Sequence, residues 1–273
     1  MAKICVVNIH GEEISKLMDF YAQKVSPKGL KPDTEVIVKS PRPGYRRAYD
    51  GSYSFAQGLN KKGMLERIVE AEREGCDAVV VHCFLDPAAR EAREMVDIPV
   101  IGPGESSLLL ATMMGHKFGI VTVNDPKVVP DTERMIALLG LHERAIPRPV
   151  RTMTMPLKEF TLKGGLEMKD EFRKEVIEDI LQRGRECVAD GADVVVIGCT
   201  GLAPLCTAEG VAVIPDQGVP ILDCLAVALK VAEAFADFRI RMGLPSVSRG
   251  GLYSKPSEKA FRGIAERFGL IVG

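Results

Sequence analysis

Residues 75–83 of the chain read GCDAVVVHC, and residues 191–199 read GADVVVIGC. The two stretches share a glycine, an aspartate, a valine-rich run and a closing cysteine, at an offset of 116 residues (199 − 83). The same offset relates ICVVN at residues 4–8 to IVTVN at residues 120–124. Two matches at one spacing indicate an internal duplication, because self-similarity at a fixed period is the signature of repeated structural units.

Each half alternates short, continuous apolar runs with longer amphipathic stretches. This alternation is typical of buried parallel strands joined by helices. We therefore expect an α/β fold with two pseudo-symmetric domains, each a parallel sheet flanked by helices. The expected strands are 4–7, 78–81, 119–123 and 193–197, and the expected helices are 62–74, 127–139 and 170–189.

The length of 273 residues is sufficient for two domains of the usual size with a cleft between them. We expect a first α/β domain from residues 1–113 plus 220–240 and a second from residues 114–219. The apolar-rich helix that follows Pro220 is expected to return to the first domain. Residues 241–273 are expected to form a C-terminal extension.

The charge balance argues against a highly charged partner. The chain has 37 acidic and 36 basic residues, a net charge of −1, so no broad field attracts nucleic acid or an anionic membrane. The N-terminal apolar run ends at Asn8, too early for a signal peptide, and no stretch reaches membrane-spanning length. We expect a cytoplasmic protein that binds a small-molecule substrate, and neither nucleic acid nor a membrane. Assembly into a homo-oligomer stays open.

The cysteines predict neither a disulfide framework nor a structural zinc site, because their number is odd and no CxxC pair occurs. No second histidine stands at metal-ligand spacing from His10 or His82, so we assign no metal and treat both as structural. Two of the seven cysteines end the repeated strands, and the other five are expected to be structural. The seven are Cys5, Cys76, Cys83, Cys187, Cys199, Cys206 and Cys224.

Cys83 and Cys199 each lie where a predicted strand gives way to a helix. Open parallel sheets bind ligands at the carboxyl ends of their strands, and Asn8 and Asn124 occupy such ends as well. After Cys83, Asp86 is a good N-cap and the next residue, a proline, suits the first helical position. If the two halves pack with these edges facing, the duplication places one cysteine on either side of a shared cleft.

Two opposed cysteines suit the racemisation of a carbon acid, which removes a proton from one face and returns one to the other. One cysteine must begin as thiolate and the other as thiol. A free thiol titrates near about 8.5, and we expect the helix starts to lower this pKa. Backbone amides of residues 84–87 and 200–203 are expected to stabilise the enolate, so no cofactor is required.

A structural reading stands beside this one, because a cysteine that ends a valine-rich strand is more often a small core residue. The repeat favours catalysis for Cys83 and Cys199. Asn8 and Asn124 are by default turn residues at strand ends, and their paired position gives a substrate-binding role equal weight. Thr200 either starts its helix or contacts the substrate.

The chain resembles the aspartate/glutamate/hydantoin racemase superfamily, and within it the hydantoin and allantoin racemases. The likeness covers residues 3–225 and rests on three motifs in the family's order: CFLDP at 83–87, VDIPVIG with GESS at 96–107, and GCTGL at 198–202. The resemblance implies two flavodoxin-like domains with the active site between them and no pyridoxal phosphate. It also implies that Cys83 and Cys199 are the two bases.

Departures from the family bear on the substrate. The first-strand motif of hydantoin racemases resembles Asn-Pro-Asn, whereas this chain has Asn-Ile-His at residues 8–10. Amino-acid racemases usually show Cys-Asn-Thr and Cys-Thr-His, which this chain lacks, so tight binding of an amino-acid carboxylate is not expected. Tyr49 lies in a segment similar to an aromatic loop over the pocket of hydantoin racemases, and packing is its default role. We expect substrate contacts from Asn8, Phe84, Leu85, Asn124, Thr200 and Gly201.

These observations favour racemisation of a 5-substituted hydantoin or a similar cyclic ureide such as allantoin. Three alternatives stay open. One is an aspartate/glutamate-type amino-acid racemase. The second is an isomerase or lyase of the maleate isomerase type, in which one cysteine acts as nucleophile. The third is a ligand-binding or redox-sensing protein that has kept the fold.

Overall fold

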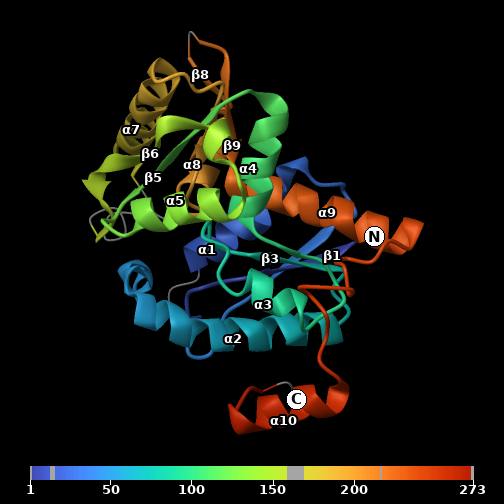
Figure 1. The fold of residues 1–273 in the computed structure, drawn as a ribbon. Coiled ribbons are helices and arrows are strands. Elements are labelled where there is room, and N and C mark those ends of the chain that lie inside the picture. The colour runs from blue at the N-terminus through green and yellow to red at the C-terminus, as the bar shows by residue number, and fades with distance from the viewer. Residues whose placement is uncertain (1, 13–15, 159–168, 216, 272–273) are drawn as a thin grey trace.

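The computed structural model describes residues 2–12, 16–158, 169–215 and 217–271. The chain builds two sheets, one above the other in Figure 1, each flanked by helices, as the sequence predicts. The first sheet has the order β2-β1-β3-β4 and the second β6-β5-β7-β9-β8, with β8 the one antiparallel strand. The strands of the first sheet are β1 (Lys3–Val7), β2 (Glu35–Lys39), β3 (Ala78–Val81) and β4 (Val100–Ile101); those of the second are β5 (Phe118–Asn124), β6 (Ala145–Pro156), β7 (Val194–Ile197), β8 (Val213–Ile214) and β9 (Val219–Asp223).

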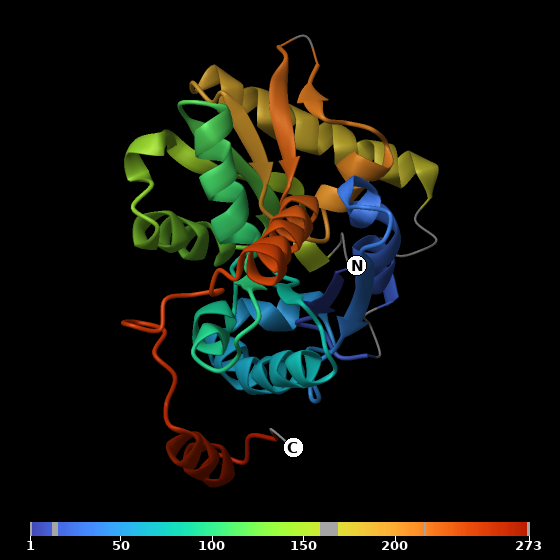
Figure 2. The same cartoon turned by 90° about the vertical axis from the view of Figure 1, so that its right-hand side faces the viewer.

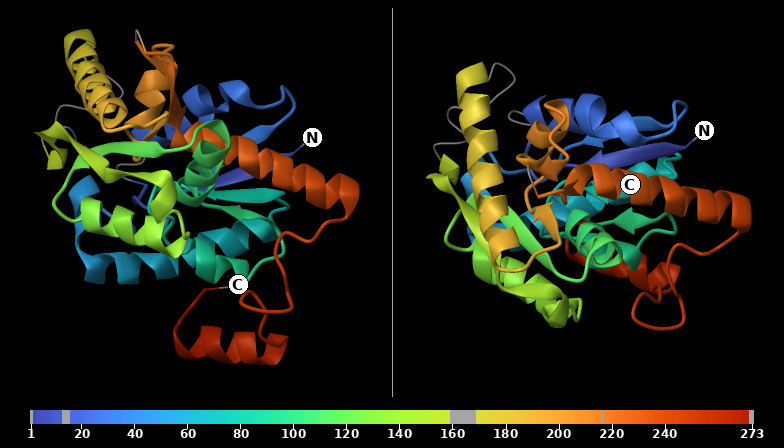
Figure 3. Two further views of the ribbon diagram at one scale, coloured as in Figure 1. Left: turned by 45° about the horizontal axis from the view of Figure 1, so that its top comes forward. Right: turned by 90° about the horizontal axis from the view of Figure 1, so that it is seen from above.

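Helices cover both faces of each sheet. In the first half, α2 packs beside β1 and β3, and α9 and the short helices after β1 lie on the other face. In the second half, α7 runs along the outer side of the sheet, which Figure 3 shows, with α4 and α5 opposite. The helices are α1 (Lys16–Phe20), η1 (Tyr21–Val25), η2 (Ser26–Gly29), η3 (Ala48–Ser52), α2 (Ser54–Arg73), α3 (Ala89–Arg93), α4 (Pro103–Met114), α5 (Val128–Leu138), η4 (His142–Arg144), α7 (Asp170–Ala189), α8 (Ala203–Ala208), α9 (Cys224–Met242) and α10 (Glu258–Arg267).

The segment after residue 218 passes from one half to the other. Strand β9 pairs with β7 in the second sheet, so the predicted placement of residues 220–223 with the first domain is wrong. Helix α9 then packs against β1, β3 and β4 of the first sheet. The carboxylate of Asp223 accepts hydrogen bonds from the Leu225 and Ala226 amides and so begins the helix. The other domain boundaries stay a prediction, and residues 159–168 and 216 within them lie outside the described residues.

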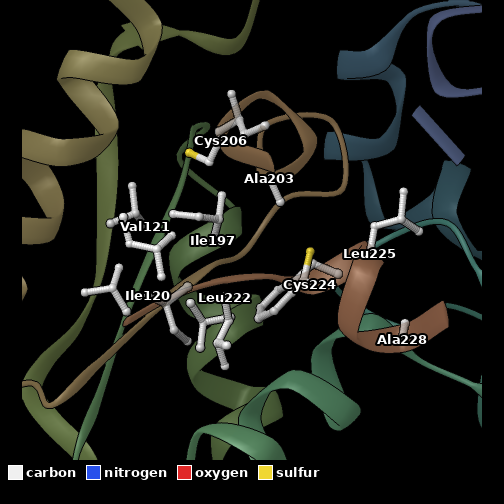
Figure 4. Packing of buried hydrophobic residues seen from close by; sticks show 14 of the residues in the cluster. Ile120, Val121, Ile197, Ala203, Cys206, Leu222, Cys224, Leu225 and Ala228 are labelled. Atoms are coloured by element: carbon white, nitrogen blue, oxygen red, sulfur yellow. The ribbon is translucent and has the colours of Figure 1, made fainter. Parts of the chain in front are cut away.

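One apolar core joins the halves. It contains strand residues from both sheets and the first turns of α8 and α9. Figure 4 shows Cys206 and Cys224 among its aliphatic side chains. Both thiols are buried, as are those of Cys5, Cys76 and Cys187. Continuity of this core fixes the carboxyl ends of the two sheets relative to each other.

The two sheets are not in the register that the sequence repeat predicts. Val7 pairs with Val81, whereas Val121 pairs with Ile197. The residues that follow Val7 and Val121 in these pairs are Asn8 and Thr122, which are 114 residues apart (122 − 8), whereas the cysteines are 116 apart (199 − 83). The expected equivalence of Asn8 and Asn124 is wrong, because β5 is two residues longer than β1.

The C-terminal segment after α9 stays on the first half. Arg249 donates to the backbone carbonyls of Arg93 and Val96 and pairs with Asp97. Helix α10 lies below α2 in Figure 1 and at the end of an extended connection in Figure 2, and the Ile271 N–H just after it donates to Glu66 of α2 at 2.8 Å. Across the described ranges, no helix combines the length and the apolar character needed to cross a membrane.

Candidate active site

A cavity of about 170 Å³ lies between the carboxyl ends of the two sheets. Six of the eight predicted site residues border it, including Cys83 from the first half and Cys199 from the second. Both cysteines are partly exposed, whereas the other five are buried. The described lining residues are Ile9, His10, Met18, Gly51, Ser52, Gln57, His82, Cys83, Phe84, Leu85, Thr122, Val123, Asp125, Lys127, Val128, Asp131, Leu157, Gly198, Cys199, Thr200 and Gly201.

The turn after each cysteine wraps backbone amides around its sulfur. The Leu85 N–H donates to Cys83, and the Gly201 N–H donates to Cys199; the Leu202 N–H lies near the same sulfur and donates to the Cys199 carbonyl at 3.1 Å. Hydrogen bonds to a sulfur atom favour the thiolate over the thiol. Stabilisation of the enolate by amides of these two turns stays a prediction.

Burial acts in the opposite direction and is the larger effect. Burial, together with the charge of Cys199, raises the pKa of the Cys83 thiol to about 12. Burial also raises the pKa of Cys199. The expectation of lowered thiol pKa values is therefore wrong for this structure, because the amide donors only partly offset the loss of solvation.

Asp86 anchors the turn after Cys83 to helix α4. The predicted helix start at Asp86 is displaced: α3 begins at Ala89, and Asp86 instead caps α4, its carboxylate accepting from the amides of Gly104 (2.9 Å) and Glu105 (2.7 Å). Burial raises the pKa of this carboxyl to about 7 despite both hydrogen bonds. The turn that carries Cys83 is thus held by the amino end of α4.

Replacing Asp86 with alanine should lower the free energy of unfolding by about 1–3 kcal/mol, because two buried backbone donors lose their acceptor. Urea unfolding followed by circular dichroism measures the change. Asp170→Ala, which removes an exposed carboxylate from the first turn of α7, should change stability by less than about 0.5 kcal/mol. Equal effects of the two substitutions would contradict the capping role.

Asn8 and Asn124, both predicted to contact the substrate, do not border the cavity. Asn8 is fully buried, and its amide bridges Asp19, Ser40 and His82. Asn124 donates to the carbonyl of Thr154 on the neighbouring strand. A direct substrate contact by either residue stays a prediction.

The predicted aromatic loop lies near the cavity, with Tyr49 outside its lining. Arg47 lies over the Tyr49 ring, 4.7 Å from its centroid. Two neighbours that the sequence did not single out reach across the mouth: Ser52 donates to Asp125 of the other half, and the Lys127 ammonium lies 4.8 Å from the ring centroid of Tyr53. These contacts of Ser52 and Tyr53 with the segment after β5 join the two halves beside the cavity.

His10 and His82 also line the cavity, although the sequence suggested structural roles. Burial lowers the pKa of His10 to about 4 and that of His82 to about 3, so both imidazoles are neutral near pH 7. Their Nε2 atoms are buried and have no hydrogen-bond partner within the described part of the chain. One signal in the sequence could have drawn attention to His82: it precedes the repeated cysteine where the second half has Gly198.

No group of three His, Cys, Asp or Glu side chains within the described ranges is arranged to hold a metal ion. The chemistry available at the cavity includes two thiols, two neutral imidazoles, the hydroxyls of Thr122 and Thr200, and the charged groups of Asp125, Lys127 and Asp131. The threonine hydroxyls donate to backbone carbonyls, that of Gly198 at 2.7 Å and that of His82 at 3.3 Å. Their remaining lone pairs, with the imidazoles, make the lining rich in hydrogen-bond acceptors.

Comparison with known proteins agrees with this arrangement. The sequence model of the Asp/Glu/hydantoin racemase family matches residues 18–232. The chain belongs to this family. A hydantoin racemase of Pseudomonas sp. (strain NS671) is 30% identical over 249 residues, which are 90% of each chain. A hydantoin racemase of Rhizobium meliloti is 31% identical over 180 residues, 65% of this chain and 68% of the relative.

Solved structures of racemases have the same fold as this chain. The allantoin racemase of Klebsiella pneumoniae superimposes with a TM-score of 0.74 at 25% identity, covering 95% of this chain and 96% of that one. The allantoin racemase of Pseudomonas fluorescens gives 0.73 at 26% identity, covering 93% and 97%. The resemblance stated from the sequence is thereby confirmed, and the chain is a racemase of this family, an isomerase.

Proposed function

We propose that this racemase works without a cofactor and that Cys83 and Cys199 exchange the proton of one substrate carbon. The observation that carries the proposal is the shared cavity: each cysteine ends the equivalent strand of its sheet, and both border the same space. A substrate carbon between them would present one face to each sulfur. The thiolate on one side removes the proton, and the thiol on the other side returns one with inversion.

The intermediate would be an enolate whose oxygen needs hydrogen-bond donors. Among the turn residues, the N–H groups of Phe84 and Thr200 make no hydrogen bond to another described residue. Both residues line the cavity. These two amides are the donors that we assign to the enolate oxygen.

The substrate that we propose is a 5-substituted hydantoin or a related cyclic ureide. A dry cavity of about 150 Å³ accommodates a molecule the size of benzene, so the space here suits one small ring with a substituent. Lys127 is the one cation among the described lining residues, which also include Asp125 and Asp131. A neutral ring meets this environment at lower cost than the two carboxylates of aspartate or glutamate.

Proton–deuterium exchange tests this function. In deuterium oxide, the C5 proton of a hydantoin should exchange faster with the protein than without it, and polarimetry should show loss of optical rotation. Nuclear magnetic resonance follows the exchange directly. Absence of exchange on hydantoins, allantoin and amino acids alike would overturn the racemase mechanism. A covalent thioether on Cys83, detected by mass spectrometry after turnover, would instead indicate nucleophilic chemistry.

A further inference from the structure

The residue before the first cysteine breaks the symmetry of the two halves. The second half has Gly198, where a side-chain carbon would meet Ile120 Cγ2 at 2.7 Å and the Phe84 ring at 3.2 Å. The first half has His82, whose side chain is almost completely buried and lines the cavity. The site therefore carries one imidazole that the duplication does not explain.

A chain of hydrogen bonds determines the tautomer of this imidazole. A carboxylate oxygen of Asp19 can only accept, so the group of Asn8 that lies 2.8 Å from it is the NH₂ group. The side-chain oxygen of Asn8 must then point the other way, and it lies 2.6 Å from Nδ1 of His82. An amide oxygen can only accept, so Nδ1 carries the hydrogen and Nε2 carries a lone pair.

Nε2 of His82, which carries this lone pair, is buried and makes no hydrogen bond to another described residue. A buried polar atom without a partner costs free energy that a ligand hydrogen bond can recover. The imidazole stays neutral because burial lowers its pKa to about 3.

We infer that Nε2 of His82 accepts a hydrogen bond from a ring N–H group of the bound substrate. The identity of the ligand rests on the proposed function, because a cyclic ureide carries such N–H groups beside its carbonyls. A carboxylate has no hydrogen to donate, and the lone pairs of its oxygen atoms would repel the lone pair of Nε2. His82 thus selects neutral N–H donors over anions, and Asn8 is a positioning residue that fixes the acceptor tautomer.

Methylation of the substrate tests the contact. We expect methylation at one ring nitrogen, N1 or N3, to lower kcat/KM roughly 10- to 100-fold more in the wild-type protein than in His82→Leu. His82→Gln, whose amide oxygen can accept, should restore part of that discrimination. His142→Gln changes an exposed histidine and should behave as wild type. Equal methylation penalties at both nitrogens in wild type and His82→Leu would overturn the inference.

A second measurement separates this inference from the proposed function. In protein labelled with ¹⁵N-histidine, Nε2 of His82 should resonate as an unprotonated nitrogen and shift when hydantoin is added. A shift without any C5 exchange would support the contact while removing the racemase proposal. Exchange without a shift and without a methylation difference would overturn the His82 contact but not the racemase proposal. The absence of both exchange and shift would overturn the contact and the proposal together. Asn8→Leu should populate the second tautomer, because Nδ1 loses its acceptor.

Discussion

Cys83→Ser and Cys199→Ser should each reduce racemisation roughly 100- to 10,000-fold, the range that a positioned acid or base contributes. A serine hydroxyl is a far weaker acid than a thiol, so it neither ionises to take the proton nor returns one readily. Each variant keeps one of the two cavity cysteines, and that cysteine can still deprotonate the enantiomer whose hydrogen faces it. We therefore expect residual C5 deuterium exchange without inversion, for one enantiomer in Cys83→Ser and for the opposite one in Cys199→Ser.

The control for this experiment is Cys206→Ser. Cys206 is buried in the apolar core, away from the cavity lining, and burial raises the pKa of its thiol to about 12. Once circular dichroism shows that this variant is folded, it should racemise like wild type. Full racemisation by either cavity variant would rule out the two-base mechanism, and a loss confined to a response to oxidants would favour a redox sensor.

The second large effect that we expect is one of pH: the rate of racemisation should rise about tenfold per pH unit between pH 6 and 9. The reacting base is a thiolate, and burial raises the pKa of Cys83 to about 12 and also raises that of Cys199. Below these pKa values, the thiolate fraction grows in proportion to hydroxide, so log kcat/KM has a slope near one. Alkylation of Cys83 by iodoacetamide, followed by mass spectrometry, should show the same slope. A plateau that begins below pH 7 would mean that the amide donors outweigh burial.

The upper limit of this pH range is set by stability. Burial raises the pKa of Cys187 and Cys206 to about 12, above the value of about 8.5 for a free thiol. Between those values the folded protein binds more protons than the unfolded chain, so their contribution is complete below about pH 8.5 and is lost as the pH rises toward 12. Circular dichroism at each pH identifies where the measured rate still belongs to the folded protein.

The prediction of strands succeeded for strands that are buried on both faces, because burial there requires apolar residues. Residues 78–81 were predicted as a strand and form β3, because valines buried on both faces of a parallel sheet leave a continuous apolar run. The predicted equivalence of Asn8 and Asn124 failed, because the register of β5 differs by two residues from the one that the sequence repeat predicts. Asn124 shares a spacing with Asn8 in the sequence, but β5 extends past its partner and turns Asn124 to Thr154.

The sequence by itself determined the two α/β halves, the family and the pair of cysteines at equivalent strand ends, because apolar periodicity and duplication are local properties of the chain. Only the tertiary structure decided the thiol pKa values, the capping of α4 by Asp86 and the acceptor tautomer of His82. Each of these depends on groups that folding brings together: the burial that desolvates the thiols, the amides of a later helix, or the Asp19 carboxylate that orients the Asn8 amide. Solvation and hydrogen bonding act through space, and the distances that control them are set when the two halves pack together.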